Sequence, residues 1–480
     1  MSAVTPARKT SAEPEPPATD NGRPPAASAL RALVLRLHFY AGLLIAPFLL
    51  VAALTGALYA ASYQIERVVY SDQLTVPAKD TAVPVGEQVD AALAAHPDGT
   101  LSAVRPAPAK GETTRVLLDD PSVPEGRKLA VFVDPHTAEV KGALASYGGS
   151  GALPFRAWVS GLHANLNLGE TGRLYSELAA SWMWVVVLGG LVLWFGRRRA
   201  QRKLRGTKGR RRTLSLHGTV GVWAALGLLI LSATGLTWST YAGENIGELR
   251  AKVGGSTPTI SAAPGGGHEG HGSGGGHAGH GDGHGDEAGS EHPDIGIDHV
   301  LSIARDDQKL DGPLEITPPV VGEDGTPGAY VVKQIDRQVP HRLDQIAVDA
   351  SSGEVTDRLD FADHPVLAKL TSIGISAHDG RLFGLANQIV LLALALSVVA
   401  LIVWGYRMWW QRRPDRDGRL SFGRPYPRGA LRNLPVTWWL PLAGVTALVG
   451  WFVPLLGLSL LAFLAVDVVL GLVARSRAEA

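Results

Sequence analysis

The stretch "LHFYAGLLIAPFLLVAALTG", residues 37–56, places a histidine at the start of a run apolar enough to cross a membrane. Residues 216–235, "LHGTVGVWAALGLLILSATG", repeat the arrangement almost position for position. Each histidine is followed by a glycine one helical turn later and by a Thr-Gly pair at the end of the run. The two sets are His38, Gly42, Thr55 and Gly56, and His217, Gly221, Thr234 and Gly235. We therefore expect a chain built from two related halves.

The composition is that of a membrane protein, because 46% of the 480 residues are hydrophobic, only 19% are charged, and the apolar residues gather in blocks. A helix needs about 20 apolar residues to cross a hydrocarbon core of about 30 Å. We predict four core transmembrane spans followed by a C-terminal helical hairpin that turns near Pro454. The spans are residues 31–62, 175–196, 214–241 and 386–410, and the hairpin is residues 437–474.

The chain has no cysteine. This excludes iron–sulfur clusters, thioether-linked haem, thiolate zinc sites and disulfides. Any metal or cofactor must be held by histidine, carboxylate or backbone groups.

Basic residues near the span ends predict the orientation. Residues 196–212 carry ten basic and no acidic residues, so the loop 197–213 is expected in the cytoplasm. The same side should hold the tail 1–30, the loop 411–436 and the C-terminus. We expect the tail to be disordered and to contain no cleaved signal peptide. We interpret the basic loop as a topology signal in contact with lipid headgroups and expect no nucleic-acid partner.

Two polar segments, residues 63–174 and 293–365, are then left outside as small α+β domains. Each is expected to begin with a short helix and to continue in strands of alternating Val and Ile. The hairpin "VFVDPHTAEV" (131–140) in the first segment matches "IAVDASSGEV" (346–355) in the second. The outer segments therefore repeat each other as the spans do.

Each half has one more histidine near the outer face, His163 in "GLHANLNLGETGRLY" and His378 in "SAHDGRLFGLANQ". Two histidines at one depth on facing helices suit axial ligation of a haem iron from opposite faces of the ring. We expect His38 and His217 to form an inner pair and His163 and His378 an outer pair, with a haem at each. A single histidine at a membrane boundary is also commonly an interfacial polar residue, or packs between helices.

Other residues fit this hypothesis. Gly42 and Gly221 would leave room for a flat porphyrin or for close helix packing, and Arg36 would pair with haem propionates. Asp467 and Glu177 are costly inside lipid, so they are expected either to have a functional role or to serve helix packing.

The blocks "LHFYAGLLIAPFLLVAALTGALYA", "SAHDGRLFGLANQ" and "VWGYRMWWQRRP" resemble those of PepSY-associated transmembrane proteins, a family that includes bacterial ferric-siderophore reductases. The resemblance extends from about residue 31 to 475. It implies PepSY-like outer domains and a multi-pass protein of the cytoplasmic membrane with haem b. In such a protein the four paired histidines would hold haem, and electrons would pass outward to a ferric-siderophore or other metal complex.

A histidine-glycine tract occupies the linker 264–292, outside the pattern of this family. Its composition predicts disorder, and imidazoles at this density chelate Cu, Zn, Ni or Fe adaptably. The alternative is a flexible spacer whose histidines are incidental. The candidate metal ligands are His268, His271, His277, His280, His284 and His292.

The leading hypothesis is a haem b electron-transfer protein whose electron donor is a separate cytoplasmic reductase or a membrane quinol, because no glycine-rich dinucleotide turn occurs in the chain. One alternative is a non-enzymatic membrane protein whose outer domains bind a peptide, an envelope protease or a metal. Another is a metal permease, although the spans lack the midplane carboxylates and broken helices typical of transporters.

Overall fold

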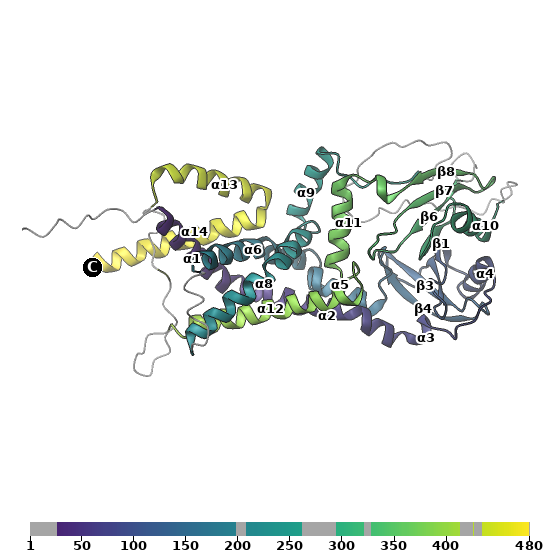
Figure 1. Ribbon diagram of the computed structural model, residues 1–480, viewed down its shortest axis with the longest axis horizontal. Helices are drawn as coiled ribbons and strands as arrows, with labels where there is room; N and C mark the ends of the chain where they lie inside the picture. The colour runs from purple at the N-terminus through teal and green to yellow at the C-terminus, as the bar shows by residue number, and fades with distance from the viewer. Residues whose placement is uncertain are drawn as a thin grey trace, which may run out of the picture.

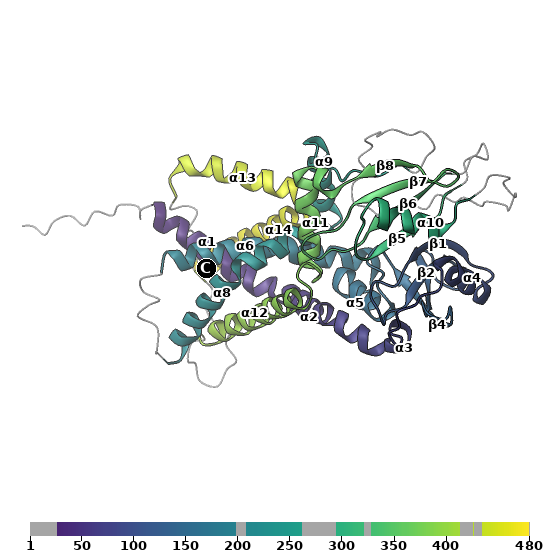
Figure 2. The ribbon, with the colours of Figure 1, turned by 45° about the vertical axis from the view of Figure 1, so that its right-hand side comes forward.

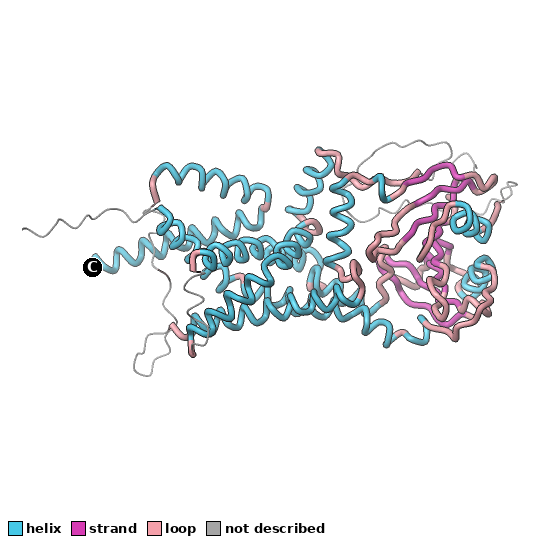
Figure 3. Tube along the Cα trace, in the orientation of Figure 1, coloured by secondary structure: helices cyan, strands magenta, loops and turns pink. Residues whose placement is uncertain are grey.

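The structure is a computed structural model that describes residues 26–197, 208–261, 294–320, 328–412, 426 and 434–479. The histidine-glycine linker, most of the tail, the middle of the basic loop and most of the loop 411–436 lie outside these residues. Long helices form one end of the molecule and an antiparallel sheet forms the other (Figures 1 and 3).

Five long helices make up the core of the helical end. They are α1 (Ala26–Leu44), α2 (Ala46–Val69), α6 (Gly169–Phe195), α8 (Arg210–Leu236) and α12 (Leu385–Trp410). Helix α6 packs against α1 and α8, and α12 packs against α2 and α8. Their outer faces are apolar and uncovered, as at Trp223, which is 85% exposed. Six helices of the described residues are long and apolar enough to cross a membrane, so the chain is a multi-pass membrane protein.

The first predicted span, residues 31–62, is two helices that meet at Ile45, and both are long enough to count among the six. The break follows from Pro47, which has no N–H to donate to the carbonyl of Leu43, one turn earlier. Tyr406 of α12 supplies the missing donor, with its hydroxyl 2.9 Å from that oxygen. A backbone group freed inside the bundle thus finds a partner on a neighbouring helix.

The C-terminal segment forms a helical hairpin of α13 (Trp439–Phe452) and α14 (Pro454–Glu479), preceded by the short helix η4 (Val436–Trp438). Figure 2 shows the two helices joined at one end and separating away from that turn. Gly450 and Gly457 lie at their closest approach, where the absence of side chains lets the backbones touch. Helix α14 is long enough to span a membrane, but the 14 residues of α13 reach only about 21 Å.

The sheet domain is one continuous antiparallel sheet of eight strands in the order β4-β3-β2-β1-β5-β6-β7-β8. The first half contains β1 (Thr100–Arg105), β2 (Thr114–Asp119), β3 (Arg127–Val133) and β4 (Val140–Tyr147). The second half contains β5 (Leu314–Thr317), β6 (Ala329–Gln334), β7 (Gln345–Asp349) and β8 (Val355–Leu359). The two outer segments therefore share one sheet, because β1 pairs with β5. The sequence predicted two separate small domains.

The two halves of the sheet repeat each other in detail. Asp134 donates its backbone N–H to the carbonyl of Glu139, and Asp349 does the same to Glu354, both at 2.9 Å. The pairing register also shifts at the same place in each half, immediately before these turns. The internal duplication seen in the sequence is thus present in the fold.

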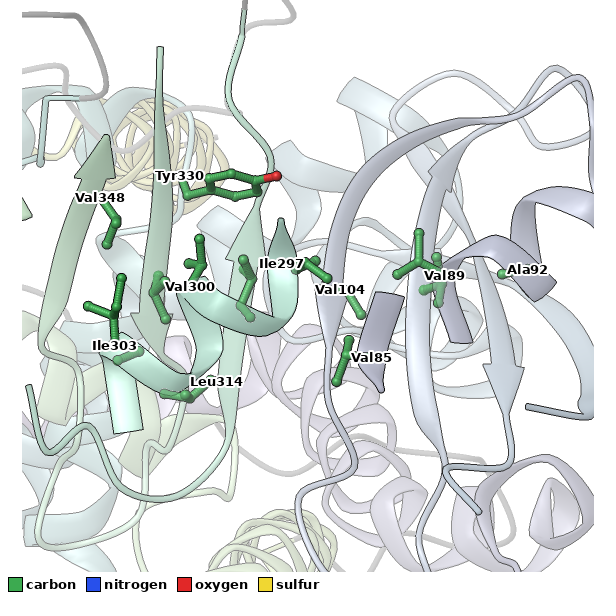
Figure 4. Packing of buried hydrophobic residues seen from close by; sticks show 14 of the residues in the cluster. Val85, Val89, Ala92, Val104, Ile297, Val300, Ile303, Leu314, Tyr330 and Val348 are labelled. Carbon is green, nitrogen blue, oxygen red and sulfur yellow. The ribbon is translucent and has the colours of Figure 1, made fainter. Parts of the chain in front are cut away.

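One hydrophobic core serves both halves of the sheet. Helix α4 (Val85–Ala95) covers the first half, and α10 (Ile297–Ser302) with η1 (Ile303–Asp307) covers the second. Figure 4 shows Val85, Val104 and Ile297 where the two halves meet. Asp298 of α10 also accepts hydrogen bonds from the backbone N–H groups of Val85 and Gly86, at 2.6 and 3.0 Å, and so joins the start of α4 to the other half.

Shorter helices connect the sheet to the membrane helices. They are α3 (Ser71–Leu74), α5 (Pro154–Asn165), α9 (Tyr241–Lys252), η2 (Phe361–Asp363) and α11 (Val366–His378). Figure 1 shows α9 and α11 running across the long axis of the molecule, between the bundle and the sheet. Helices α5 and α11 each come just before a long helix, α6 and α12, and occupy corresponding places in the two halves.

Candidate functional site: two histidine pairs

The inner histidines meet inside the bundle. His38 lies on α1 and His217 on α8, and their ring centroids are 6.3 Å apart at an interplanar angle of 83°. Nδ1 of His38 is 2.9 Å from the carbonyl oxygen of Val186, and Nδ1 of His217 is 3.1 Å from that of Leu401. A carbonyl oxygen can only accept, so each Nδ1 carries the proton and each Nε2 presents its lone pair.

The outer histidines meet in the same way at the sheet end of the bundle. His163 lies on α5 and His378 is the last residue of α11, and their ring centroids are also 6.3 Å apart. Nδ1 of His163 is 3.0 Å from the hydroxyl of Thr55, and Nδ1 of His378 is 2.6 Å from that of Thr234. These threonines belong to the repeated Thr-Gly pairs.

The threonine hydroxyls also determine the tautomer of the outer rings. Thr55 donates its hydroxyl proton to the carbonyl of Val51 at 2.8 Å, and Thr234 donates to the carbonyl of Ile230 at 2.8 Å. With its proton engaged, each hydroxyl accepts from the histidine Nδ1–H. All four imidazoles are therefore protonated at Nδ1 and unprotonated at Nε2. Proteins commonly orient metal-binding histidines in this way.

The distance within each pair is suitable for a shared metal ion. Metal-to-imidazole bonds of about 2.0 Å, together with about 1.1 Å from each nitrogen to its ring centre, place two opposed ring centroids about 6 Å apart. Both pairs are at 6.3 Å. The donor set, two neutral imidazoles and no thiolate or carboxylate, matches the axial ligands of a six-coordinate haem. The residues present thus fit a haem between the rings of each pair.

Glycines leave no side chain beside three of the rings. A methyl group built at Gly190 of α6 would lie 3.2 Å from Cε1 of His38, and one at Gly56 would lie 3.1 Å from Cε1 of His163. At Gly235 the corresponding distance to His378 is 3.7 Å. Side chains at Gly190 and Gly56 would crowd the imidazoles, whereas a methyl group at Gly235 would make an ordinary van der Waals contact. The first two glycines thus allow the rings to approach the helices closely.

A cavity of about 270 Å³ adjoins the inner pair. Gly42 and Gly221 line it. There is open space where a Cβ of Gly42 would lie, whereas a Cβ of Gly221 would be 3.6 Å from Cδ2 of Leu401. Its cationic lining residues are Arg197, Arg210 and Arg412. Tyr426 also lines the cavity, beneath the guanidinium of Arg412, which is 4.1 Å from its ring centre.

Arg36 does not have the predicted role. It forms an ion pair with Asp467 of α14, and the two side chains are only 12% and 22% exposed. A carboxylate alone inside lipid is energetically unfavourable, and the charge of Asp467 on α14 is thus compensated by Arg36 on α1. The cations available to a carboxylate inside the cavity are the three arginines that line it.

Glu177 also has a structural explanation. It is 1% exposed, and its carboxylate accepts the backbone N–H groups of Tyr241 and Ala242 at 3.1 and 2.9 Å. These are the first amides of α9, so Glu177 satisfies the free donors at the start of a helix that lies across the bundle.

Aromatic rings that the sequence did not single out surround the outer pair. Tyr59 stacks on His163 at 6.4 Å with an angle of 20°, and Trp238 meets the edge of His378 at 5.3 Å. Tyr63, one turn beyond Tyr59 on α2, extends this aromatic contact toward the sheet. The spacing of Gly56, Tyr59 and Tyr63 on one helix face was the available signal.

The candidate ligands of the histidine-glycine tract lie outside the described residues. Within the described ranges, no group of three or more His, Cys, Asp or Glu residues is placed to hold a metal ion. The four membrane histidines therefore make up the candidate site.

The fold and the site together define a multi-pass membrane protein with two half-buried histidine pairs at different depths and a duplicated sheet domain beyond them. The chain belongs to the PepSY-associated TM region family, whose sequence pattern matches residues 35–412 and thus confirms the resemblance found in the sequence. Comparison with curated proteins gave no match.

Proposed function

We propose that this protein carries electrons across the cytoplasmic membrane through two b-type haems and reduces ferric-siderophore or other metal complexes outside. The observation that supports this best is that all four candidate histidines are paired at 6.3 Å with Nδ1 engaged as a donor. Structural histidines have no need to share one tautomer in two separate pairs, whereas axial ligands do.

The inner pair, His38 and His217, would hold one haem and the outer pair, His163 and His378, the other. Each haem would supply a one-electron Fe(III)/Fe(II) couple. The residues of the chain orient and support this couple. Two backbone carbonyls and two threonine hydroxyls fix the ring orientations.

The two pairs lie at different depths. His38 and Thr55 are separated by 17 residues along α1 and α2, which is about 25 Å of helix. Thr55 holds the outer ring of His163, so this length approximates the separation of the two sites. Two cofactors thus divide the crossing into shorter transfers.

The predicted orientation gives the direction of transfer. The basic residues near the inner pair would lie in the cytoplasm, where a separate reductase or a membrane quinol would donate electrons. Arg197, Arg210 and Arg412 line the inner cavity and would pair with the carboxylates of a haem there. The outer pair lies next to the sheet domain, which would receive the metal complex.

A visible spectrum of the detergent-purified protein tests the proposal. We expect a Soret band and split bands after reduction with dithionite, with two haems per chain. His38→Ala or His217→Ala should remove one haem and His163→Ala or His378→Ala the other. His299→Ala, at an exposed histidine of the sheet domain, is the matched control and should retain both. A colourless protein after expression with sufficient haem would refute the proposal.

Removing residues 264–292 should also leave both haems in place. We propose that this tract captures or buffers metal ions at the outer face, and equilibrium dialysis with Cu, Zn, Ni and Fe against the shortened chain measures that contribution directly.

A further inference from the structure

Three arginines converge where the first half of the sheet meets the membrane helices. Arg105 ends β1, Arg115 lies on β2 and Arg156 lies on α5; we call them the arginine cluster. All three approach Gly151, in the loop between β4 and α5. A methyl group built there would lie 3.6 Å from Nη1 of Arg115 and would clash with Nη1 of Arg105. The carbonyl of Gly151 accepts from Arg156 at 3.1 Å.

This arrangement is electrostatically unfavourable by itself. Arg105 and Arg115 are direct cross-strand partners in the sheet, and like charges in such a pair repel. Burial, followed by repulsion from Arg105 and Arg156, lowers the pKa of Arg115 to about 10. A protein that places three guanidinium groups together needs negative charge to stabilise them.

Among the described residues, ion pairs join two of the three arginines to acids, whereas Glu66 and Glu112 act on Arg115 without an ion-pair contact. Arg105 forms an ion pair with Glu315 at 2.6 Å, and Arg156 forms one with Glu66 at 2.8 Å. Glu112, another acid near the cluster, pairs with the exposed Arg67 at 3.8 Å. Arg115 is half-buried, and its side chain makes neither a hydrogen bond nor an ion pair within the described part of the chain. Its contact is with the ring of Phe132, at 5.5 Å.

Hydrogen-bonding capacity is also left over. Arg156 is 5% exposed, and its Nε and Nη2 donate to Glu66 and to the loop carbonyls of Ser150 and Gly151. Its Nη1 is buried and has no partner among the described residues. Buried guanidinium donors are rarely left unpaired. A guanidinium without an ion-pair partner and an unused buried donor therefore occur together in one cluster.

The cluster is connected to the outer histidine pair. The guanidinium of Arg156 lies 4.6 Å above the ring of Tyr63, Tyr63 contacts Tyr59, and Tyr59 stacks on His163. From Thr55 to Glu66 is about 16 Å along α2. The loop that covers the cluster contains Gly148 and Gly149, and there is open space around both.

We propose that the arginine cluster binds the carboxylate groups of an anionic metal chelate, with Arg115 and Nη1 of Arg156 as its donors. The identification of the ligand as a metal complex rests on the proposed function, whereas the preference for an oxyanion follows from the cluster alone. Guanidinium groups match carboxylates in a two-bond geometry, and the loop carbonyls at Ser150 and Gly151 occupy donors that an incoming anion would use.

The test is equilibrium binding of gallium(III) citrate to the detergent-solubilised full-length protein, measured by isothermal titration calorimetry. Gallium replaces ferric iron because it is not reduced, so binding is measured without electron transfer. Arg115→Gln should weaken binding by about tenfold or more, the loss typical of one charge-assisted hydrogen bond. Arg127→Gln, at a basic residue of β3 in the same half of the sheet, should stay within about twofold of wild type. Binding should also weaken as the salt concentration rises.

Arg115→Lys provides a second variant should the neutral one fold poorly, because it retains the charge and loses the planar fork, and it should bind with intermediate affinity. A gallium complex of a cationic trihydroxamate should bind wild type and Arg115→Gln with similar affinity.

Equal affinities of wild type and Arg115→Gln for gallium citrate would overturn the proposal. So would loss of a haem from Arg115→Gln, since the carboxylates at the cluster would then belong to the cofactor. The titration needs no haem, so a colourless protein that binds gallium citrate would refute the proposed function and leave the anion site standing.

Discussion

Thr234→Val is the change that tests the outer site most directly. Valine has nearly the shape of threonine, so the change removes the hydroxyl that accepts Nδ1–H of His378 at 2.6 Å and leaves the helix otherwise intact. A buried donor left without its acceptor costs about 1–3 kcal/mol, which corresponds to about fivefold to 150-fold in an equilibrium constant. The hydroxyl also fixes which ring nitrogen carries the proton, so its loss allows the ring to rotate or change tautomer.

We therefore expect Thr234→Val to lower the affinity of the outer site for haem by about 10-fold to 100-fold and to leave the inner site unchanged. Haem per chain is measured by the pyridine haemochrome method during titration with haem, and redox titration assigns the loss to one of the two centres. Thr237→Val is the matched control, because Thr237 lies one turn on and its hydroxyl donates to the carbonyl of Thr234 and to no histidine. If Thr234→Val retained both haems with wild-type affinity and potential, the threonine bond would have no part in holding a ligand.

Four further changes probe contacts within the helices, at the outer site and in the sheet. Asp467→Leu alone should destabilise the detergent-solubilised protein by about 3–5 kcal/mol because it leaves Arg36 charged and largely buried without this partner. The double variant Arg36→Leu with Asp467→Leu should recover most of that loss, and thermal unfolding of the three proteins measures the coupling. Glu177→Gln should weaken the start of α9 by about 1 kcal/mol, seen as faster hydrogen exchange of its first amides, and unchanged exchange would contradict the capping role. Gly56→Val should displace His163, because even a methyl group there would lie 3.1 Å from its Cε1, and should reduce outer haem without affecting inner haem. Hydrogen bonds from the hydroxyl of Ser351 and from Ser352 lower the pKa of Asp349 from 3.8 to about 2. The stabilisation that these bonds give is therefore present above about pH 4 and is lost as the pH falls toward 2. Asp349→Asn should flatten the pH dependence of the free energy of unfolding in that range.

The pairing of the histidines could be anticipated because helical geometry fixes where a residue lies along a span. Two runs with the same spacing of His, Gly and Thr-Gly, one from His38 and one from His217, must place both rings at one depth if the spans are equivalent. The hydrogen-bond partners could not be anticipated. Thr55 and His163 are 108 residues apart, and they meet only because α5 packs against α2. Local spacing indicated that the Thr-Gly pair was repeated but not what it would contact.

The helices that carry the outer histidines were missed for a related reason. Residues 154–165 form the helix α5, yet Gly161 and Asn165 near its end and Asn167 just beyond it weaken the helical pattern. The single eight-stranded sheet could not be predicted either, because it depends on one pairing, Val104 with Ile316, between short strands more than 200 residues apart. By contrast, the break at Ile45 had a visible cause in Pro47.

Each histidine pair takes one member from each half of the chain, and this has a physical consequence for how the sites are built. His38 and His163 belong to the first half, and His217 and His378 to the second, so neither half alone contains a complete pair. The supports also cross between helices, since Val186 of α6 holds the ring of His38 and Leu401 of α12 holds that of His217. The halves are joined again in the sheet, where β1 pairs with β5 and Asp298 caps α4. Association of the halves at both ends therefore fixes the separation of the rings in the bundle, and a change that loosens the sheet should affect the outer pair before the inner one.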